Sequence, residues 1–228
     1  MVSPEEAGTR AADGPGWRDL AANVPGISIT HEAARRRHAE GAGADRSWRI
    51  GADGEHVIAG LLAELATPSR LDRLRRRGPR WRVLHSVPIG HGRADIDHVL
   101  VGPPGVVTIN TKHHHRGRLV VESHRLIVNG RRTDYITRSQ AEGASATRAL
   151  QAALHYLGER ELARQLTVRP MIAVVGGVLQ VWDWPGDVSI VTTTSLLRGL
   201  RALPGRFDAR EVDAIYEIAR RSTTWLHV

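Results

Sequence analysis

The chain has 228 residues, of which 41% are hydrophobic, so it can bury one full core, and its formal net charge is +8. It contains no cysteine, which excludes a disulfide framework, a thiol nucleophile and a thiolate metal site. Any metal must therefore be held by oxygen or imidazole, and the positive charge favours a polyanionic partner.

The sequence gives no sign of a membrane or secretion signal. No apolar run approaches the length of a membrane span. Residues 1–10 include Glu5 and Glu6 and lack the basic-then-apolar pattern of a signal peptide. We therefore expect a cytoplasmic protein without a membrane partner, and the sequence carries no signal for a particular oligomeric state.

The basic residues are unevenly distributed. Residues 1–50 carry seven arginines and seven Asp or Glu residues, so the surplus lies in residues 51–228. Of the 32 Lys and Arg residues, a single one is lysine, Lys112. Lysine is a compact charge that can lose its proton when desolvated, so arginine does not replace it at a catalytic position. Lys112 is thus a candidate functional residue, although an arginine-biased chain can also retain one lysine by chance.

The N-terminal part combines an arm with a charged helix. Residues 1–28 show no sustained period and include the turn formers Asp13, Gly14, Pro15 and Gly16, so we expect a flexible arm. Residues 31–40 predict a short charged helix.

A longer helix is predicted from about residue 50 to 66. Its apolar residues recur at helical spacing and are Val57, Ile58, Leu61, Leu62 and Leu65. Asp53 and Gly54 precede them and suit an N-terminal cap, which would place Glu55 in the first turn. A charged helix is then expected at 69–77, followed by a strand from Trp81 to His85.

Two hairpins follow. The runs 95–101 and 106–112 flank the turn Gly-Pro-Pro-Gly and predict two antiparallel strands. Both strands carry apolar residues on both faces, as in a central sheet that is covered on each side. The runs 118–123 and 124–130 predict a further hairpin.

The second half alternates helices and strands. The expected elements are a helix at 138–157, a buried strand at 171–177, another strand at 188–193, and helices at 195–203 and 208–221. Helix, three strands, helix and strand together predict an α/β fold with a mixed central β-sheet flanked by helices. We divide the chain into an arm (1–49), a main domain (50–192) and a C-terminal helical extension packed on it (193–228).

The residues that carry chemistry lie on the first hairpin. If Gly102 to Gly105 form its loop, paired residue numbers sum to 207, so Asp97 faces Asn110. Asp95 then faces Lys112, and all four side chains project from one face because side chains alternate along a strand. The alternative is that the aspartates merely cap a turn, but Asp97 lies inside an apolar run.

This set of residue types suits a metal site. Carboxylate oxygens hold hard cations such as Mg²⁺ or Mn²⁺. A neighbouring ammonium orients water and neutralises the charge of a phosphate in the transition state. The hairpin therefore predicts a cation site with a lysine beside it.

Other polar and aromatic residues have plainer interpretations. His98 would face away from Asp97, as a core or supporting residue. Consecutive histidines at 113–115 cannot all converge on one ion, because alternate side chains on a strand point apart. The tryptophans are expected to be packing anchors, and the arginine clusters 35–37 and 73–77 to be solvated helix faces.

Three segments resemble the nuclease-related domain (NERD) family. They are GADGE (51–55), ADIDHVLVGPPGVVTINTK (94–112) and the helix that begins near RSQAE (138–142). The similarity covers roughly residues 50–192. The family is placed by similarity in the PD-(D/E)xK nuclease superfamily, whose restriction-endonuclease-like core has the element order predicted above.

The resemblance implies roles for individual residues. Glu55 would be the acidic residue on the first helix and Asp97 the metal ligand of the hairpin. Lys112 would be the lysine of the signature, and Gln140 would support the site from the following helix. As an alternative, Glu55 is a first-turn acid that complements the helix dipole.

One position departs from the superfamily pattern, which has an acidic residue two positions before the lysine. That position is Asn110 here. An amide oxygen can coordinate Mg²⁺ but brings no charge, so the metal would be held by Glu55, Asp97 and Asn110, with Asp95 as a supporting carboxylate.

The sequence thus predicts a metal-dependent nuclease that binds DNA and hydrolyses phosphodiester bonds. One alternative keeps the fold and the basic surface but has lost turnover through Asn110. Another is a scaffold or partner-binding protein in which the basic charge is compositional.

Overall fold

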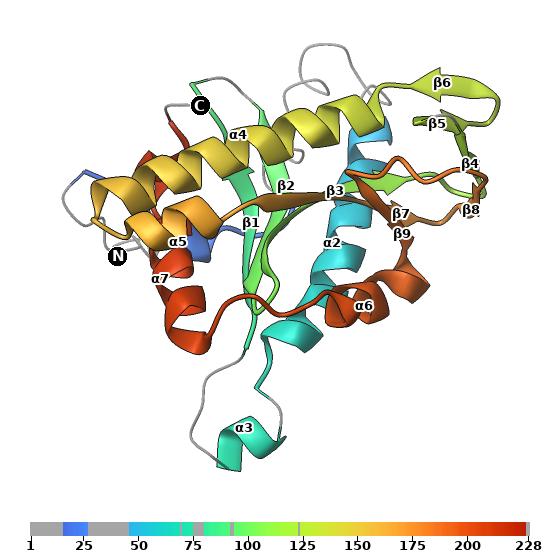
Figure 1. Ribbon diagram of the computed structural model, residues 1–228. Coiled ribbons are helices and arrows are strands. Elements are labelled where there is room, and N and C mark those ends of the chain that lie inside the picture. The colour runs from blue at the N-terminus through green and yellow to red at the C-terminus, as the bar shows by residue number, and fades with distance from the viewer. Residues whose placement is uncertain are drawn as a thin grey trace, which may run out of the picture.

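The computed structural model describes residues 16–26, 46–68, 70–74, 80–91, 94–122 and 124–226. A five-stranded sheet has the order β1-β2-β3-β7-β9, and a four-stranded sheet has the order β6-β5-β4-β8 (Figure 1). In the larger sheet β1, β2 and β3 are antiparallel, whereas β3, β7 and β9 are parallel. The expected α/β fold with a mixed central sheet flanked by helices is confirmed.

The elements have the following bounds. The larger sheet contains β1 (Arg82–Pro88), β2 (Asp95–Gly102), β3 (Gly105–His113), β7 (Val168–Val175) and β9 (Ser189–Thr192). The smaller sheet contains β4 (Arg118–Glu122), β5 (Arg125–Val128), β6 (Arg131–Thr133) and β8 (Val178–Val181). The helices are α2 (Arg46–Ala66), α3 (Arg70–Leu74), α4 (Tyr135–Tyr156), α5 (Arg160–Gln165), α6 (Thr193–Ala202) and α7 (Ala209–Ala219), with 3-10 turns η1 (Leu20–Ala22) and η2 (Ser222–Trp225).

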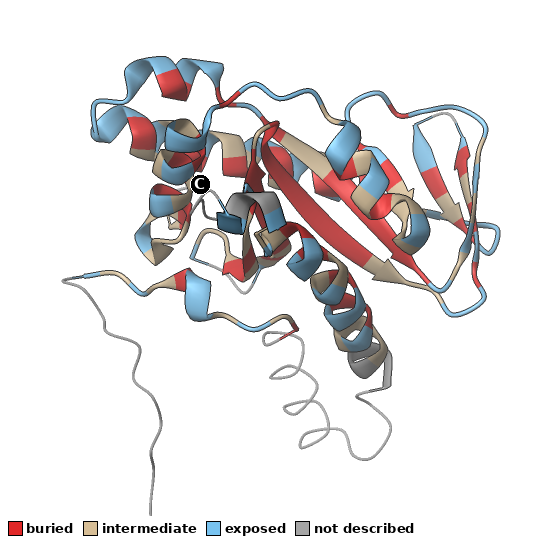
Figure 2. Cartoon of the chain, turned by 90° about the horizontal axis from the view of Figure 1, so that it is seen from below, coloured by how far each residue is buried: buried red, intermediate tan, exposed pale blue. Residues whose placement is uncertain are grey.

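Helices α4 and α2 cover opposite faces of the larger sheet. Val106 of β3 belongs to the hydrophobic cluster that contains Leu150 of α4, whereas its neighbour Val107 belongs to the cluster of Leu62 of α2. Helix α7 completes the first cluster and α6 the second. Figure 2 shows the result: buried residues fill the central strands, and the outward faces of the helices are exposed.

The register of the β2–β3 hairpin is as predicted from the turn back to His98. Gly102 pairs with Gly105, and the ladder continues to His98 and Ile109, so that paired numbers sum to 207. A Cβ atom at Gly102 would lie 2.1 Å from the Trp81 ring, which explains the glycine. Beyond His98, the Asp97 carboxylate accepts a hydrogen bond from the Thr111 amide. The hairpin therefore opens at the end that carries the polar residues.

The expected start of α2 was wrong. The helix begins at Arg46, so Asp53 and Gly54 lie inside it and do not cap it. Gly54 has a packing role instead, because a Cβ there would come within 2.8 Å of the His113 Cβ on β3. Glu55 consequently lies in the middle of the helix, which removes its interpretation as a first-turn acid.

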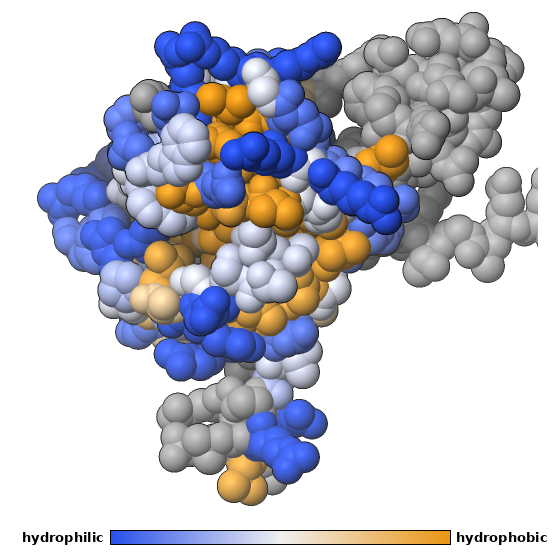
Figure 3. Space-filling model, turned by 90° about the vertical axis from the view of Figure 1, so that its right-hand side faces the viewer, coloured by the Kyte–Doolittle hydropathy of each residue, from blue (hydrophilic) through white to orange (hydrophobic). Residues whose placement is uncertain are grey.

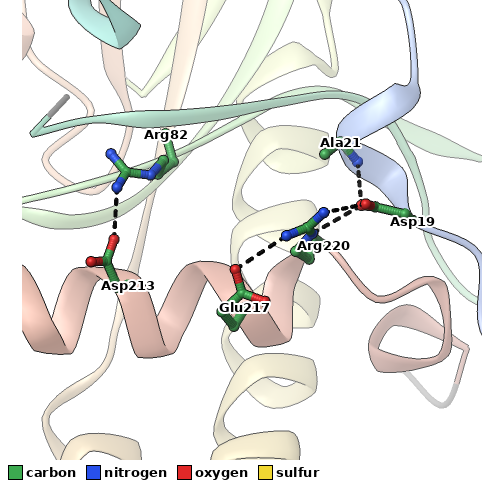
Figure 4. A network of polar contacts seen from close by, with 6 residues as sticks. All are labelled: Asp19, Ala21, Arg82, Asp213, Glu217 and Arg220. Carbon is green, nitrogen blue, oxygen red and sulfur yellow. Dashed lines mark hydrogen bonds and ion pairs between the residues drawn. The ribbon is translucent and has the colours of Figure 1, made fainter. Parts of the chain in front are cut away.

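Part of the arm differs from the flexible segment that was expected, because residues 16–26 pack against the domain. Leu20 is fully buried, and the Asn23 amide donates hydrogen bonds to the backbone carbonyls of His85 and Ser86. Asp19 pairs with Arg220 at the end of α7 (Figure 4). The helix expected at 31–40 lies outside the described residues, as do parts of the one expected at 69–77.

None of the helices in the described ranges combines the length and the apolar character needed to cross a membrane.

Candidate functional site

A cavity of about 220 Å³ lies where β3 emerges between α2 and the start of α4. Residues from all three elements and from β2 form its wall. They are Ile50, Gly51, Glu55, Asp97, Thr111, Lys112, His113, His114 and Tyr135. Three of the residues singled out in the sequence, Glu55, Asp97 and Lys112, therefore meet in one cavity.

Asp97 is held by the backbone of the neighbouring strand. Its Oδ2 atom accepts a hydrogen bond from the Thr111 amide at 2.5 Å. Burial raises the pKa of Asp97 to about 7, although the Lys112 ammonium and the Thr111 amide act in the opposite direction. The carboxyl group is thus fixed in place while its negative charge is incompletely compensated.

Glu55 reaches the cavity from α2. Its side chain is 3% exposed, and Oε2 accepts a hydrogen bond from the Gly26 amide at 2.9 Å. Burial and the charges of Asp97 and Asp95 raise the pKa of Glu55 to about 8. The docked arm therefore contributes one backbone donor to this carboxyl group.

Lys112 lies among these acidic groups. Its Nζ atom is 4.9 Å from the centroid of the Tyr135 ring, a cation–π distance. The Lys112 charge lowers the pKa values of Asp97, Glu55 and Glu142. The Lys112 ammonium therefore stabilises the ionised forms of all three carboxyl groups.

The predicted facing of Asp97 and Asn110 lies beyond the paired residues of the hairpin, and the Asn110 amide turns to helix α4. Nδ2 donates hydrogen bonds to both carboxylate oxygens of Glu142, at 2.9 and 3.0 Å. The Asn110 side chain is 8% exposed, and its Oδ1 atom is buried with no hydrogen-bond partner in the described part of the chain. Burial raises the pKa of Glu142, while Asn110 and Lys112 lower it.

Glu142 is the residue that the sequence analysis missed. It belongs to the RSQAE segment but was passed over in favour of Gln140. Glu142 is the single acidic residue within α4, a helix rich in alanine and other small residues. An isolated carboxylate in such a helix was the available signal.

The remaining expected residues have different places. The Asp95 charge raises the pKa values of Glu55, Asp97 and Glu142, although Asp95 does not line the cavity. Gln140 is partly exposed on α4 and is not among the residues that line the cavity.

The histidines after Lys112 point apart, as strand geometry requires. His113 contacts α2, where its Nδ1 atom lies 2.8 Å from the carbonyl oxygen of Ile50. His114 stacks on Tyr135 at the start of α4, with ring centroids 5.9 Å apart. His98 is fully buried, and its Nδ1 atom lies 2.8 Å from that of His85.

Among the described residues, no three His, Asp or Glu side chains are arranged so that they already form a metal site. The carboxyl groups of Glu55, Asp97 and Glu142 instead stand around a cation, Lys112, with raised pKa values. Burial is the main cause of these shifts, and a small positive ion between the carboxyl groups would stabilise their ionised forms.

Comparison with known proteins gives one match. A family model described as "Nuclease-related domain" matches residues 50–175, more than half of the chain. The matched segment runs from α2 through both hairpins and α4 to the end of β7. No curated protein matches the chain, and no solved structure does.

Proposed function

The chain belongs to the nuclease-related domain family, and we propose on that basis that it is a metal-dependent nuclease that binds DNA and hydrolyses phosphodiester bonds. One observation carries the proposal: the lone lysine, Lys112, lines the same cavity as the carboxyl groups of Asp97 and Glu55. A site for phosphodiester hydrolysis needs acidic groups for a cation and a positive group that meets the phosphate.

The residues present fit Mg²⁺ or Mn²⁺. The buried Asn110 Oδ1 has no partner in the described chain, and burial raises the pKa values of Asp97 and Glu55, whose ionised forms a bound cation would stabilise. Mg²⁺ keeps several waters and takes only one or two protein carboxylates, so a crowded cage is not required. Asp97, Glu55 and Asn110 would hold the ion, which when bound supplies Lewis-acid charge at the phosphate.

The chain's own groups have distinct tasks in this proposal. The Lys112 ammonium donates hydrogen bonds to a phosphate oxygen and to the attacking water, and it offsets the charge that develops during attack. The Tyr135 ring beside Nζ limits the positions of that ammonium. Asp95 and, less directly, Gln140 support the acidic groups.

Contacts to DNA would come from exposed arginines of the four-stranded sheet. Strands β4, β5 and β6 of that sheet follow β3 in the chain and carry exposed arginines, which are Arg118, Arg125, Arg131 and Arg132. Figure 3 shows this side of the molecule, where hydrophilic residues surround hydrophobic ones. Arginine binds phosphates and displaces their counterions, so this side suits the backbone of a duplex.

The test is cleavage of supercoiled and linear DNA by the pure protein with Mn²⁺, with Mg²⁺ and with EDTA. We expect nicking or cutting that requires the metal, and DNA affinity that falls steeply as salt rises. DNA binding without cleavage under all conditions would support the degenerate binding domain, which Asn110 makes the second candidate. Absence of binding at low salt would support the scaffold interpretation.

A further inference from the structure

The position that departs from the superfamily pattern is not left without a carboxylate. Asn110 stands where the pattern has an acidic residue, yet its amide nitrogen donates to the two carboxylate oxygens of Glu142, at 2.9 and 3.0 Å. Glu142 is 32 residues away in sequence and comes from helix α4.

From this contact we propose that Glu142 supplies, from helix α4, the metal-site carboxylate that the superfamily pattern places at position 110, and that Asn110 positions it. The inference rests on the proposed function, because it assigns a ligand to the same site.

The buried amide of Asn110 supports this arrangement. With Nδ2 committed to Glu142, Oδ1 remains without a partner among the described residues although the side chain is 8% exposed. A buried amide oxygen is normally hydrogen-bonded, so an unpaired one needs an explanation. A cation bound beside Glu142 would explain the unpaired Asn110 oxygen, because carboxylate and amide oxygens are both ligands for hard cations.

Glu142 does not line the cavity itself, but its charge interacts with residues that do. Glu142 raises the pKa of the Asp97 carboxyl group, and the Lys112 ammonium lowers the pKa of Glu142. Together with its hydrogen bonds from Asn110, these effects connect Glu142 to all three hairpin positions of the superfamily pattern, which are Asp97, Asn110 and Lys112.

Helix packing fixes the position of Glu142 along α4. The next residue, Gly143, lies against Pro170 of β7, and a Cβ atom there would be 3.2 Å from the proline ring. The helix thus approaches the sheet closely at this point. Such support is needed for a ligand that comes from a different element than its partners.

The experiment tests whether a carboxylate at position 110 on β3 can replace the one at position 142 on α4. It compares wild type, Glu142→Gln and the double variant Asn110→Glu with Glu142→Gln, and it uses Glu161→Gln on the exposed surface of α5 as the matched control. Glu142→Gln retains a side-chain oxygen that can accept from Asn110, so it removes the charge and preserves the helix–strand contact. The readouts are Mn²⁺ affinity by calorimetry, the rise in melting temperature with Mn²⁺, and plasmid cleavage.

We expect Glu142→Gln to weaken Mn²⁺ binding about tenfold or more, with a metal-free circular dichroism spectrum like that of wild type. The double variant should regain most of the affinity, and Glu161→Gln should match wild type. If Glu142→Gln is unstable, Glu142→Asp serves instead. It keeps the negative charge, but its shorter side chain moves the carboxylate away from the site, so it should bind Mn²⁺ more weakly than wild type.

Three outcomes would count against the inference. Equal Mn²⁺ affinity in wild type and Glu142→Gln, or in wild type and Glu142→Asp, would overturn it while the proposed function stands. If Glu142→Gln loses Mn²⁺ affinity and the double variant does not regain it, the claim that Glu142 takes the place of a carboxylate at position 110 would be overturned. A wild-type protein that neither binds Mn²⁺ nor cuts DNA would overturn the proposed function and the inference with it.

Discussion

Two charged clusters in this protein are built on opposite principles. In the cluster of Figure 4, Arg220 pairs with Asp19 of the arm and with Glu217 of α7. The hydrogen bond to Arg220 keeps the pKa of Asp19 below its ordinary value, and Asp19 in turn raises the pKa of Arg220. In the site cluster, the Lys112 ammonium acts on Glu55, Asp97 and Glu142, and burial nevertheless raises the pKa values of all three.

The difference indicates a structural role for the Arg220 cluster and a functional role for the site cluster. Opposite charges that match each other stabilise their ionised forms and need no further partner. Carboxyl groups gathered with too little positive charge cost folding free energy unless a ligand compensates them, and such groups cluster at functional sites. The site cluster is therefore where substitution should affect activity, and the Arg220 cluster is where it should affect stability.

The largest effect should come from Lys112→Arg. The positive charge and DNA affinity are kept, but the guanidinium is too broad and too rigid to replace the ammonium between Asp97 and Tyr135. We expect cleavage to fall by about 100-fold or more, as when a transition-state donor is lost. Single-turnover cleavage rates measure it, with Arg148→Lys on the exposed face of α4 as the control. Equal rates in wild type and Lys112→Arg would remove Lys112 from the mechanism.

The next effect concerns pH and the metal-free protein. The pKa values of Glu55 and Asp97, about 8 and about 7, lie above those of an unfolded chain, so the folded state binds protons that the unfolded state has released. This contribution is fully present below about pH 4 and is lost as pH rises through 7 to 8. In EDTA, the free energy of unfolding should therefore fall from pH 5 to pH 8.

Glu55→Gln isolates the contribution of that carboxyl group. The neutral amide cannot ionise, so the variant's unfolding free energy should change less between pH 5 and pH 8, by about 2 kcal/mol. Urea denaturation at each pH measures the difference. Parallel pH profiles of wild type and Glu55→Gln would show that Glu55 is ionised at no cost, contrary to the contrast between the two clusters.

How well the sequence predicted each part depends on the range of the interactions involved. The β2–β3 register was predictable because the Gly-Pro-Pro-Gly turn and the alternation beside it are local. The start of α2 was not, because Gly54 is required by contact with His113 of β3 and not by a cap. Asp97 and Lys112 could be found from the hairpin, since strand alternation brings their side chains together.

The residues that were missed depend on contacts between distant segments. Glu142 meets Asn110 across 32 residues of sequence. The arm docks through Asp19 and Arg220, which are 201 residues apart. Periodicity and turn signals report only on neighbouring residues. They therefore predict a flexible arm and do not show that the Asn110 amide contacts Glu142.

The smallest effect should come from Asp19→Asn, which removes the charge that Arg220 pairs with and keeps the shape of the side chain. Because Asp19 and Arg220 are only partly exposed, at 22% and 28%, solvent screens the pair incompletely, and the variant should lose about 1 kcal/mol at pH 7. The folded pKa of Asp19 is lowered, so its stabilisation is present above the ordinary value of 3.8 and is lost as pH falls through the lower folded value. The difference in unfolding free energy between wild type and Asp19→Asn should thus shrink in acid, the reverse of the trend for Glu55.

Urea denaturation at pH 7 and pH 3 measures the difference at each pH, and the DNA cleavage rate of Asp19→Asn should stay near that of wild type. A large loss of cleavage in Asp19→Asn would mean that the docked arm, through the bond from the Gly26 amide to Glu55, couples the two clusters.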